Sequence, residues 1–147
     1  MIFTSVLIPE QVKLEVVDGG KQLGRADALS VEKAIQENWI KVYKTGLIST
    51  PIELESGETA VLSIARKLKI REVLIDEISA RTVAKVLGLQ PRGTLFVLLS
   101  ALKRKAISHE EFLDSIDLLM KHGFRLRQDV YLQAIREARK MMTSAEI

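Results

Sequence analysis

Short apolar runs alternate with longer amphipathic segments along the chain. The runs are brief and rich in branched side chains, so they predict strands over residues 5–8, 39–43 and 73–75, with a short edge strand at 89–91. The intervening and following segments repeat apolar residues every three or four positions, which predicts helices over 9–17, 28–38, 57–68, 77–87, 94–105, 109–121 and 128–141. Short apolar strands that alternate with helices predict a three-layer α/β fold with a short parallel sheet and a helical C-terminal end.

Several helix ends carry local signals. Pro9 suits the first position of a helix, and Asp18-Gly19-Gly20 is expected to end that helix. Ser108 and Glu111 have the spacing of a capping box, which predicts a helix start between them. These signals set the expected boundaries of the elements.

Composition narrows the class of protein. The chain has 147 residues, 47% of them hydrophobic, and no cysteine, which excludes a disulfide scaffold, a thiol nucleophile and cysteine-ligated zinc. We expect one domain over residues 1–147. No apolar run approaches the ~20 residues of a membrane helix, and the N-terminus lacks the basic and small-residue features of a signal peptide. We therefore expect a cytoplasmic protein that does not enter membranes.

The net charge of +3 is unevenly distributed. Residues 66–105 carry 10 basic and 3 acidic side chains, so the basic excess lies in the middle of the chain. Such a block attracts phosphates and favours RNA as a partner. An equally good interpretation is a set of solvated helix faces, because lysine and arginine stabilise helix C-termini.

Acidic residues are the main candidates for chemistry. Asp76 and Glu77 directly follow the predicted strand 73–75, at the edge where parallel α/β sheets place their active sites. Glu58 shares a helix face with apolar residues, an unusual place for an acid. Carboxylates in such positions hold Mg²⁺ or Mn²⁺. The alternatives are that Asp76 caps the next helix and that Glu58 serves the helix dipole.

Two acids at one edge of a parallel sheet suit metal-dependent hydrolysis of a phosphodiester. Arg81, one turn into the helix after Asp76, would orient a carboxylate or contact a phosphate, or is simply a surface arginine. No phosphate-binding glycine loop and no nucleophilic serine motif is present. A metal-dependent nuclease therefore fits better than the other common chemistries.

The order of these motifs resembles the PIN-domain superfamily, and within it a prokaryotic PIN-like branch. The resemblance rests on Val6-Leu7-Ile8-Pro9-Glu10, Trp39-Ile40, Gly57-Glu58-Thr59-Ala60, Leu74-Ile75-Asp76-Glu77 with Ala80-Arg81, and Gly93-Thr94-Leu95, and it covers nearly the whole chain. It implies a Rossmann-like fold with acids that gather Mg²⁺ or Mn²⁺, and often ribonuclease activity, including toxins of toxin–antitoxin pairs. Glu58 and Asp76 would be the metal ligands, with catalytic support from Glu77 and substrate contacts from Arg81 and Thr94.

One departure from the family pattern concerns the N-terminus. Family members begin with a central strand that ends in an aspartate, followed by a helix, before the segment that matches Val6-Leu7-Ile8-Pro9. Only five residues precede Val6 here and none is acidic, so the first metal ligand and the central strand are expected to be missing. A late gene start, a fragment, and a degenerate member that uses a second chain would each explain such an N-terminally truncated sheet.

The leading interpretation is thus a PIN-like nucleic-acid-binding protein, ancestrally a Mg²⁺-dependent ribonuclease, with weak or no cleavage. The alternative is a catalytically inactive module that binds RNA or a protein, such as an antitoxin-like partner. A sheet without its central strand leaves unpaired backbone groups, which cost on the order of 1–3 kcal/mol each when buried. We expect direct pairing of the strands at 5–8 and 73–75, insertion of another segment, or a partner chain to close the gap, with a homo-oligomer as the simplest route.

Overall fold

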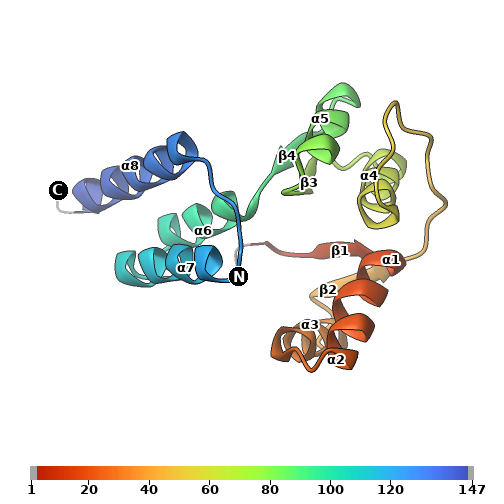
Figure 1. Ribbon diagram of the computed structural model, residues 1–147, viewed down its shortest axis with the longest axis horizontal. Coiled ribbons are helices and arrows are strands. Elements are labelled where there is room, and N and C mark those ends of the chain that lie inside the picture. Colours follow the sequence, from red (N-terminus) through yellow and green to blue (C-terminus); the bar gives the residue numbers. More distant parts are fainter. Residues whose placement is uncertain (1–2, 146–147) are drawn as a thin grey trace. The chain divides into compact units, whose positions relative to one another are not determined.

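The computed structural model describes residues 3–145, which form two compact units (Figure 1). The first, here called the sheet unit, is Phe3–Arg92, and the second, the helical unit, begins at Gly93. Each unit has its own hydrophobic core. The interpretation of residues 1–147 as a single domain stays a prediction.

The sheet unit alternates short strands with helices. Its elements in chain order are β1 (Val6–Pro9), α1 (Glu10–Lys13), the π-helical η1 (Leu14–Gly19), α2 (Gly20–Gln22), α3 (Ala26–Gln36), β2 (Ile40–Tyr43), α4 (Ser56–Leu68), β3 (Glu72–Leu74), α5 (Ile78–Val86) and β4 (Gln90–Arg92). The four predicted strands are confirmed, with bounds shifted by one residue at most. The α/β fold class is confirmed as well, since the strands are joined through helices and pair in parallel.

The strands form two separate two-stranded sheets. β1 pairs with β2 so that Val6 lies opposite Ile40, and β3 pairs with β4 so that Glu72 lies opposite Gln90. Within the described residues, β1 and β3 neither pair with each other nor hold another strand between them. Two of the three expected ways of closing the gap are therefore not used by this part of the chain.

Helix α4 connects the two half-sheets, because it packs against both β1 and β3. Its buried side chains join those of β3 and α5 in the core of the unit, which consists of Leu62, Ala65, Val73, Ile75, Ala80, Val83 and Ala84. Leu62 is fully buried, and burial of a leucine side chain contributes about 1.5–3 kcal/mol. The apolar stripe predicted for this helix is thus the surface that holds the unit together.

The predictions made from two local signals at helix ends are wrong. Pro9 is the last residue of β1 and the N-cap of α1, with extended ψ, so the helix begins at Glu10. Gly19 and Gly20 do not end the first helix, because the helical run continues through both of them to Gln22. Gly20 sits there because a Cβ at its position would lie 2.8 Å from the Cβ of Ala28 in α3. The chain leaves the helix only near Gly24, whose φ is +69°.

The helical unit consists of α6 (Thr94–Lys103), α7 (His109–Lys121) and α8 (Gln128–Ala145). Its core is built from Phe112 and Ile116 of α7 and from Ala134 and Ala138 of α8. The predicted capping box is confirmed: the Ser108 hydroxyl accepts from the Glu111 N–H at 3.1 Å, and the Glu111 carboxylate accepts from the Ser108 N–H at 2.7 Å. In the part of the chain that the structure describes, no helix is long and apolar enough to cross a membrane.

Candidate functional site

The Glu58 side chain at the start of α4 has a carboxylate oxygen without a hydrogen-bond partner among the described residues. It lies in the first turn of the helix, where the dipole favours a carboxylate. The residue is half-buried, and its Oε2 is shielded from solvent without a hydrogen-bond partner among the described residues. A buried carboxylate oxygen without a partner is costly, so this atom is suited to accept from a donor or to bind a cation.

Glu15 is a second acid at the same helix start, and sequence reasoning missed it. A Cβ at Gly57 would lie 3.4 Å from the Glu15 Oε2 and 3.5 Å from the Val12 Cγ2. The Glu15 carboxylate of η1 therefore lies against Gly57, the residue that directly precedes Glu58 in the first turn of α4. The three-residue spacing of Val12 and Glu15 places both on one helix face, but it does not show that this face meets α4.

Asp76 and Glu77 lie just beyond β3, with only Ile75 between the strand and Asp76, and Glu77 has a local role that the sequence did not predict. Glu77 is the N-cap of α5: its Oε1 accepts from the Ser79 N–H at 3.0 Å and its Oε2 from the Ala80 N–H at 2.7 Å. The backbone hydrogen bonds from Ala80 and then Ser79 lower the pKa of Glu77. The alternative that Asp76 caps this helix is therefore wrong. Asp76 is exposed just beyond the strand, and its role as a metal ligand stays a prediction.

Arg81 ties α5 to the carboxyl end of β3. Its Nη1 donates to the Ile75 carbonyl oxygen at 2.9 Å, one residue before Asp76. The side chain is half-buried rather than a free surface arginine. Thr94 is the first residue of α6 and belongs to the helical unit. The substrate contacts of both residues stay predictions.

The described residues fit a hard cation only in part. Among residues 3–145, no three His, Asp or Glu side chains come together as a ligand set. Mg²⁺, however, is commonly held by one or two carboxylates, with water and substrate phosphates in its remaining positions. The unpartnered Oε2 of Glu58 has the chemistry of such a ligand. The convergence of Glu58 and Asp76 above the sheet stays a prediction.

Part of the basic block lies at the opposite end of α4. Arg66 and Lys67 are in its last turn, about 12–14 Å along the helix from Glu58 at 1.5 Å per residue. The Lys67 ammonium also lies 5.6 Å from the centre of the Tyr43 ring, a cation–π contact. These cations therefore serve the helix end and the packing around β2, as well as forming a positive surface.

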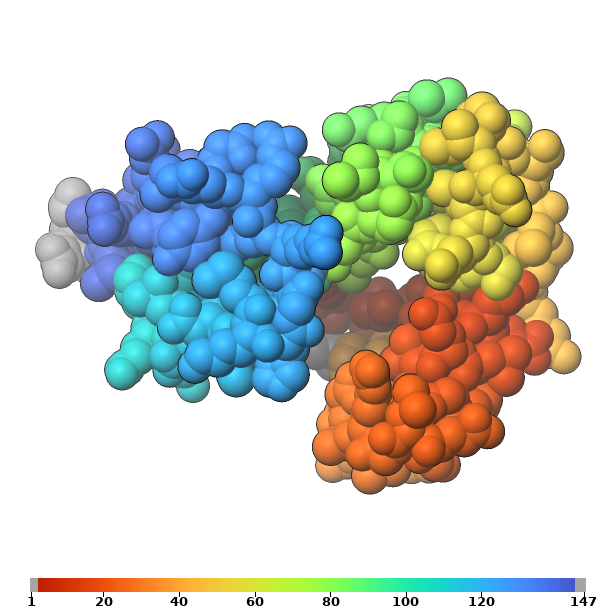
Figure 2. Space-filling model, in the orientation of Figure 1, coloured from red at the N-terminus to blue at the C-terminus, as the bar shows by residue number. Residues whose placement is uncertain are grey.

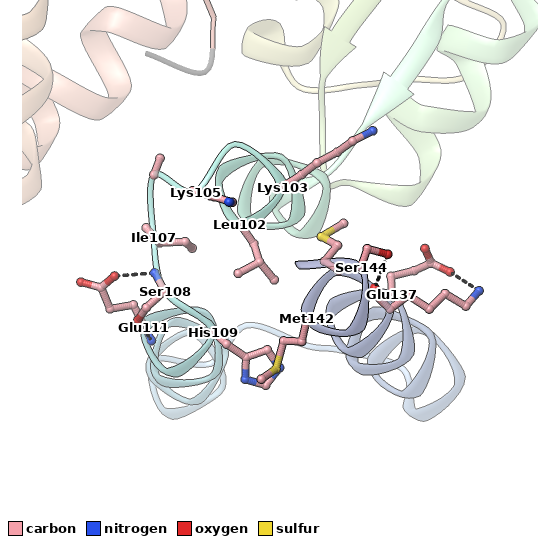
Figure 3. Close-up of a pocket in the computed structure, with 13 residues that line it drawn as sticks. Leu102, Lys103, Lys105, Ile107, Ser108, His109, Glu111, Glu137, Met142 and Ser144 are labelled. Atoms are coloured by element: carbon pink, nitrogen blue, oxygen red, sulfur yellow. Dashed lines mark hydrogen bonds and ion pairs between the residues drawn. The ribbon is translucent and has the colours of Figure 1, made fainter. Parts of the chain in front are cut away.

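The helical unit has a separate hollow of about 800 Å³ between the ends of its three helices (Figure 3). Leu102, Ile107 and Met142 supply apolar walls, and the ring of His109 lies beside Met142. The His109 Nε2 is shielded from solvent and has no hydrogen-bond partner among the described residues. None of the predicted site residues lines this hollow.

The chain is an α/β protein with two pairs of parallel strands. Its candidate carboxylates lie after a strand and at the start of a helix. A family model described as a PIN domain matches residues 1–140, and the chain belongs to the PIN-domain family. This superfamily is nuclease-like, and its members generally use divalent metal ions. No curated protein matches the chain, and no solved structure does.

Proposed function

We propose that this protein binds RNA and acts on it, at most slowly, as a Mg²⁺- or Mn²⁺-dependent endoribonuclease. The observation that carries the proposal is the shielded, unpartnered Oε2 of Glu58 in a member of a nuclease-like family. A glutamate that only interacts with the helix dipole can keep both carboxylate oxygens in water. A glutamate that binds a metal ion turns an oxygen away from water toward the ion, and that oxygen lacks a protein hydrogen-bond partner. Slow turnover is expected because no set of three ligands stands ready among the described residues to fix the ion.

Each proposed residue has a definite task. Glu58 and Asp76 hold the ion, which when bound would activate water and neutralise charge on the phosphate. Glu77 fixes the turn that carries Asp76, because both of its oxygens accept from the first turn of α5. Arg81 braces the same turn through the Ile75 carbonyl, and its remaining N–H groups contact a phosphate.

The test combines metal binding with cleavage. Thermal unfolding is measured with and without MgCl₂ or MnCl₂ for the wild type, Glu58→Gln, and the exposed loop control Glu53→Gln. We expect the ions to raise the Tm of the wild type and of Glu53→Gln, but not of Glu58→Gln. Cleavage of a fluorescent RNA is then measured with Asp76→Asn as a further variant. An unchanged response of Glu58→Gln to both ions would refute the metal role of this residue.

The second candidate is a catalytically inactive module that binds another macromolecule. It is favoured by the second edges of β1 and β3, along which no strand of the described residues pairs, because unpaired strand edges are sites where another chain can bind. Robust cleavage that disappears in Asp76→Asn would eliminate this candidate. RNA binding without cleavage, by both the wild type and Asp76→Asn, would support it over the nuclease.

A further inference from the structure

The hollow of the helical unit is a candidate binding site that the proposed function does not use. Its volume of about 800 Å³ falls within the range of small-molecule sites, roughly 300–1,000 Å³. It lies where the end of α6, the start of α7 and the last turns of α8 come together, and Figure 2 shows the cyan start of α7 beside the dark blue end of α8. Because all of its lining residues belong to the helical unit, the hollow is formed without the sheet unit.

His109, the first residue of α7, gives the hollow a hydrogen-bonding group without a partner. Its Nε2 is shielded from solvent and accepts or donates no hydrogen bond among the described residues. Native structures rarely leave a buried polar atom in this state. Figure 3 shows the imidazole ring beside Met142, a side chain that is 45% exposed near the end of α8. An exposed methionine is flexible and can move aside, so a ligand in the hollow can reach the Nε2 atom.

Both acidic side chains that line the hollow already have partners. The Glu137 carboxylate pairs with the Lys140 ammonium at 3.2 Å. The Glu111 carboxylate accepts from the Ser108 N–H at 2.7 Å in the capping box. A cationic ligand would therefore have to compete with these contacts for a carboxylate.

Lys105 supplies a positive charge at the rim of the hollow. Its ammonium has no ion pair among the described residues, and neither has that of Lys103, which Figure 3 shows extending away from the hollow. The last carbonyls of α6 do not require these cations, because those of Ala101 and Leu102 already accept from backbone N–H groups at 2.9 Å. The Lys105 ammonium is therefore available to a ligand.

We propose that this hollow binds a small organic acid with an apolar body. The carboxylate accepts from the Nε2–H of His109 and is attracted by the Lys105 ammonium, while the apolar body packs against Leu102 and Ile107. RNA is a poorer occupant, because no Phe, Tyr or Trp is among the described residues that line the hollow, and a base would find no ring to stack on.

Calorimetric titration of the full chain with decanoate, below the concentration at which it forms micelles, tests the proposal. Decyltrimethylammonium has the same apolar chain with the opposite charge, and acetate has the same carboxylate without the chain. We expect decanoate to bind and the other two ligands to bind at least tenfold more weakly. Equal binding of decyltrimethylammonium, or no binding of decanoate, would overturn the proposal.

Two substitutions remove the proposed contacts while keeping the local structure. His109→Phe keeps a ring and loses the unpartnered nitrogen, so without ligand its Tm should equal or exceed that of the wild type, yet decanoate should bind at least tenfold more weakly. Lys105→Gly removes the charge and suits the backbone, since φ of Lys105 is +56°, and should weaken binding about threefold. Lys121→Ala, an exposed lysine at the other end of α7, should leave the Kd unchanged. An unchanged Kd for His109→Phe would refute the assigned contact and the proposal with it.

NMR locates the ligand on the chain. On addition of decanoate, the amide resonances of residues 105–109 and 140–144 should shift, while that of Glu58 should not. Shifts confined to the sheet unit would overturn the proposal. Binding to phosphatidylglycerol vesicles without binding of free decanoate would also overturn it and would indicate a lipid surface as the source of the anion. None of these readouts involves divalent ions or RNA cleavage, so this proposal and the proposed nuclease can each fail alone.

Discussion

Replacing Glu58 with methionine should stabilise the protein in the absence of divalent ions. Methionine has a similar length and no oxygen, so the substitution removes the shielded Oε2 that lacks a partner. Leaving such a group unsatisfied costs about 1–3 kcal/mol. The variant also loses the favourable interaction of the carboxylate with the α4 dipole, about 0.3–1 kcal/mol. The expected net gain in the free energy of unfolding is therefore about 1 kcal/mol.

The same substitution should reverse the order of stability when an ion is present. An ion that binds only the folded state at a hundred times its Kd stabilises the wild type by about 2.7 kcal/mol. Glu58→Met lacks the ligand and should gain nothing. The variant is thus expected to be the more stable protein in EDTA and the less stable one in saturating Mg²⁺ or Mn²⁺.

Urea unfolding followed by circular dichroism, in EDTA and in MgCl₂ or MnCl₂, measures both differences. Glu53→Met, in the exposed loop before α4, is the matched control and should stay within about 0.5 kcal/mol of the wild type. A loss of more than about 1 kcal/mol for Glu58→Met in EDTA would show that the carboxylate has a stabilising partner. The reasoning from an orphaned oxygen would then fail.

Three further substitutions test other parts of the structure. Gly20→Ala should destabilise the protein by about 1–3 kcal/mol relative to Gly19→Ala, as measured by urea unfolding. The added Cβ at position 20 would lie 2.8 Å from the Cβ of Ala28, whereas the nearest atom to a Cβ at position 19 is 3.5 Å away. Both substitutions bring the same gain in helix propensity, so the difference between them reports the close contact. Ser108→Ala should cost about 1 kcal/mol through loss of the capping box, measured as a lower Tm. Hydrogen bonds from the backbone hold the pKa of Glu77 below its ordinary value in the folded state, so its contribution to stability is present above that ordinary value and is lost as pH falls through the lower folded-state pKa. The Tm difference between wild type and Glu77→Gln should therefore shrink on acidification, and a constant difference would contradict the capping role.

Local patterns in the sequence predict most of the individual elements. The branched residues of 39–43 and 73–75 are strands, and Ser108 with Glu111 fixes a helix start to the residue, because these signals depend on near neighbours. The prediction failed at Gly20, where the reason for glycine is the close approach of Ala28 on another helix. The close approach of two helices depends on tertiary packing. In the sequence, a glycine that permits such an approach looks the same as a glycine that ends a helix.

The candidate site was predictable to the same extent. An acid on an apolar helix face singled out Glu58, and the structure gives that acid an oxygen without a partner. Glu15 was missed because its approach to Gly57 depends on how η1 meets α4, which no spacing within one segment reveals. Glu77 accepts two hydrogen bonds from backbone N–H groups of α5, and the sequence alone did not show whether Glu77 or Asp76 would cap that helix. The expected catalytic role of Glu77 stays a prediction.

The division of the sheet has a consequence for the order in which the chain folds. The β3–β4 pairing joins positions 72 and 90, whereas the β1–β2 pairing joins positions 6 and 40, across a loop almost twice as long. Doubling the length of a loop raises the free energy of closing it by only about 0.6 kcal/mol. Within the described residues no strand of one sheet pairs with a strand of the other, so neither sheet needs the other in order to form. Each half-sheet can therefore nucleate by itself, with β3–α5–β4 slightly ahead, and docking both onto α4 becomes the late step of folding.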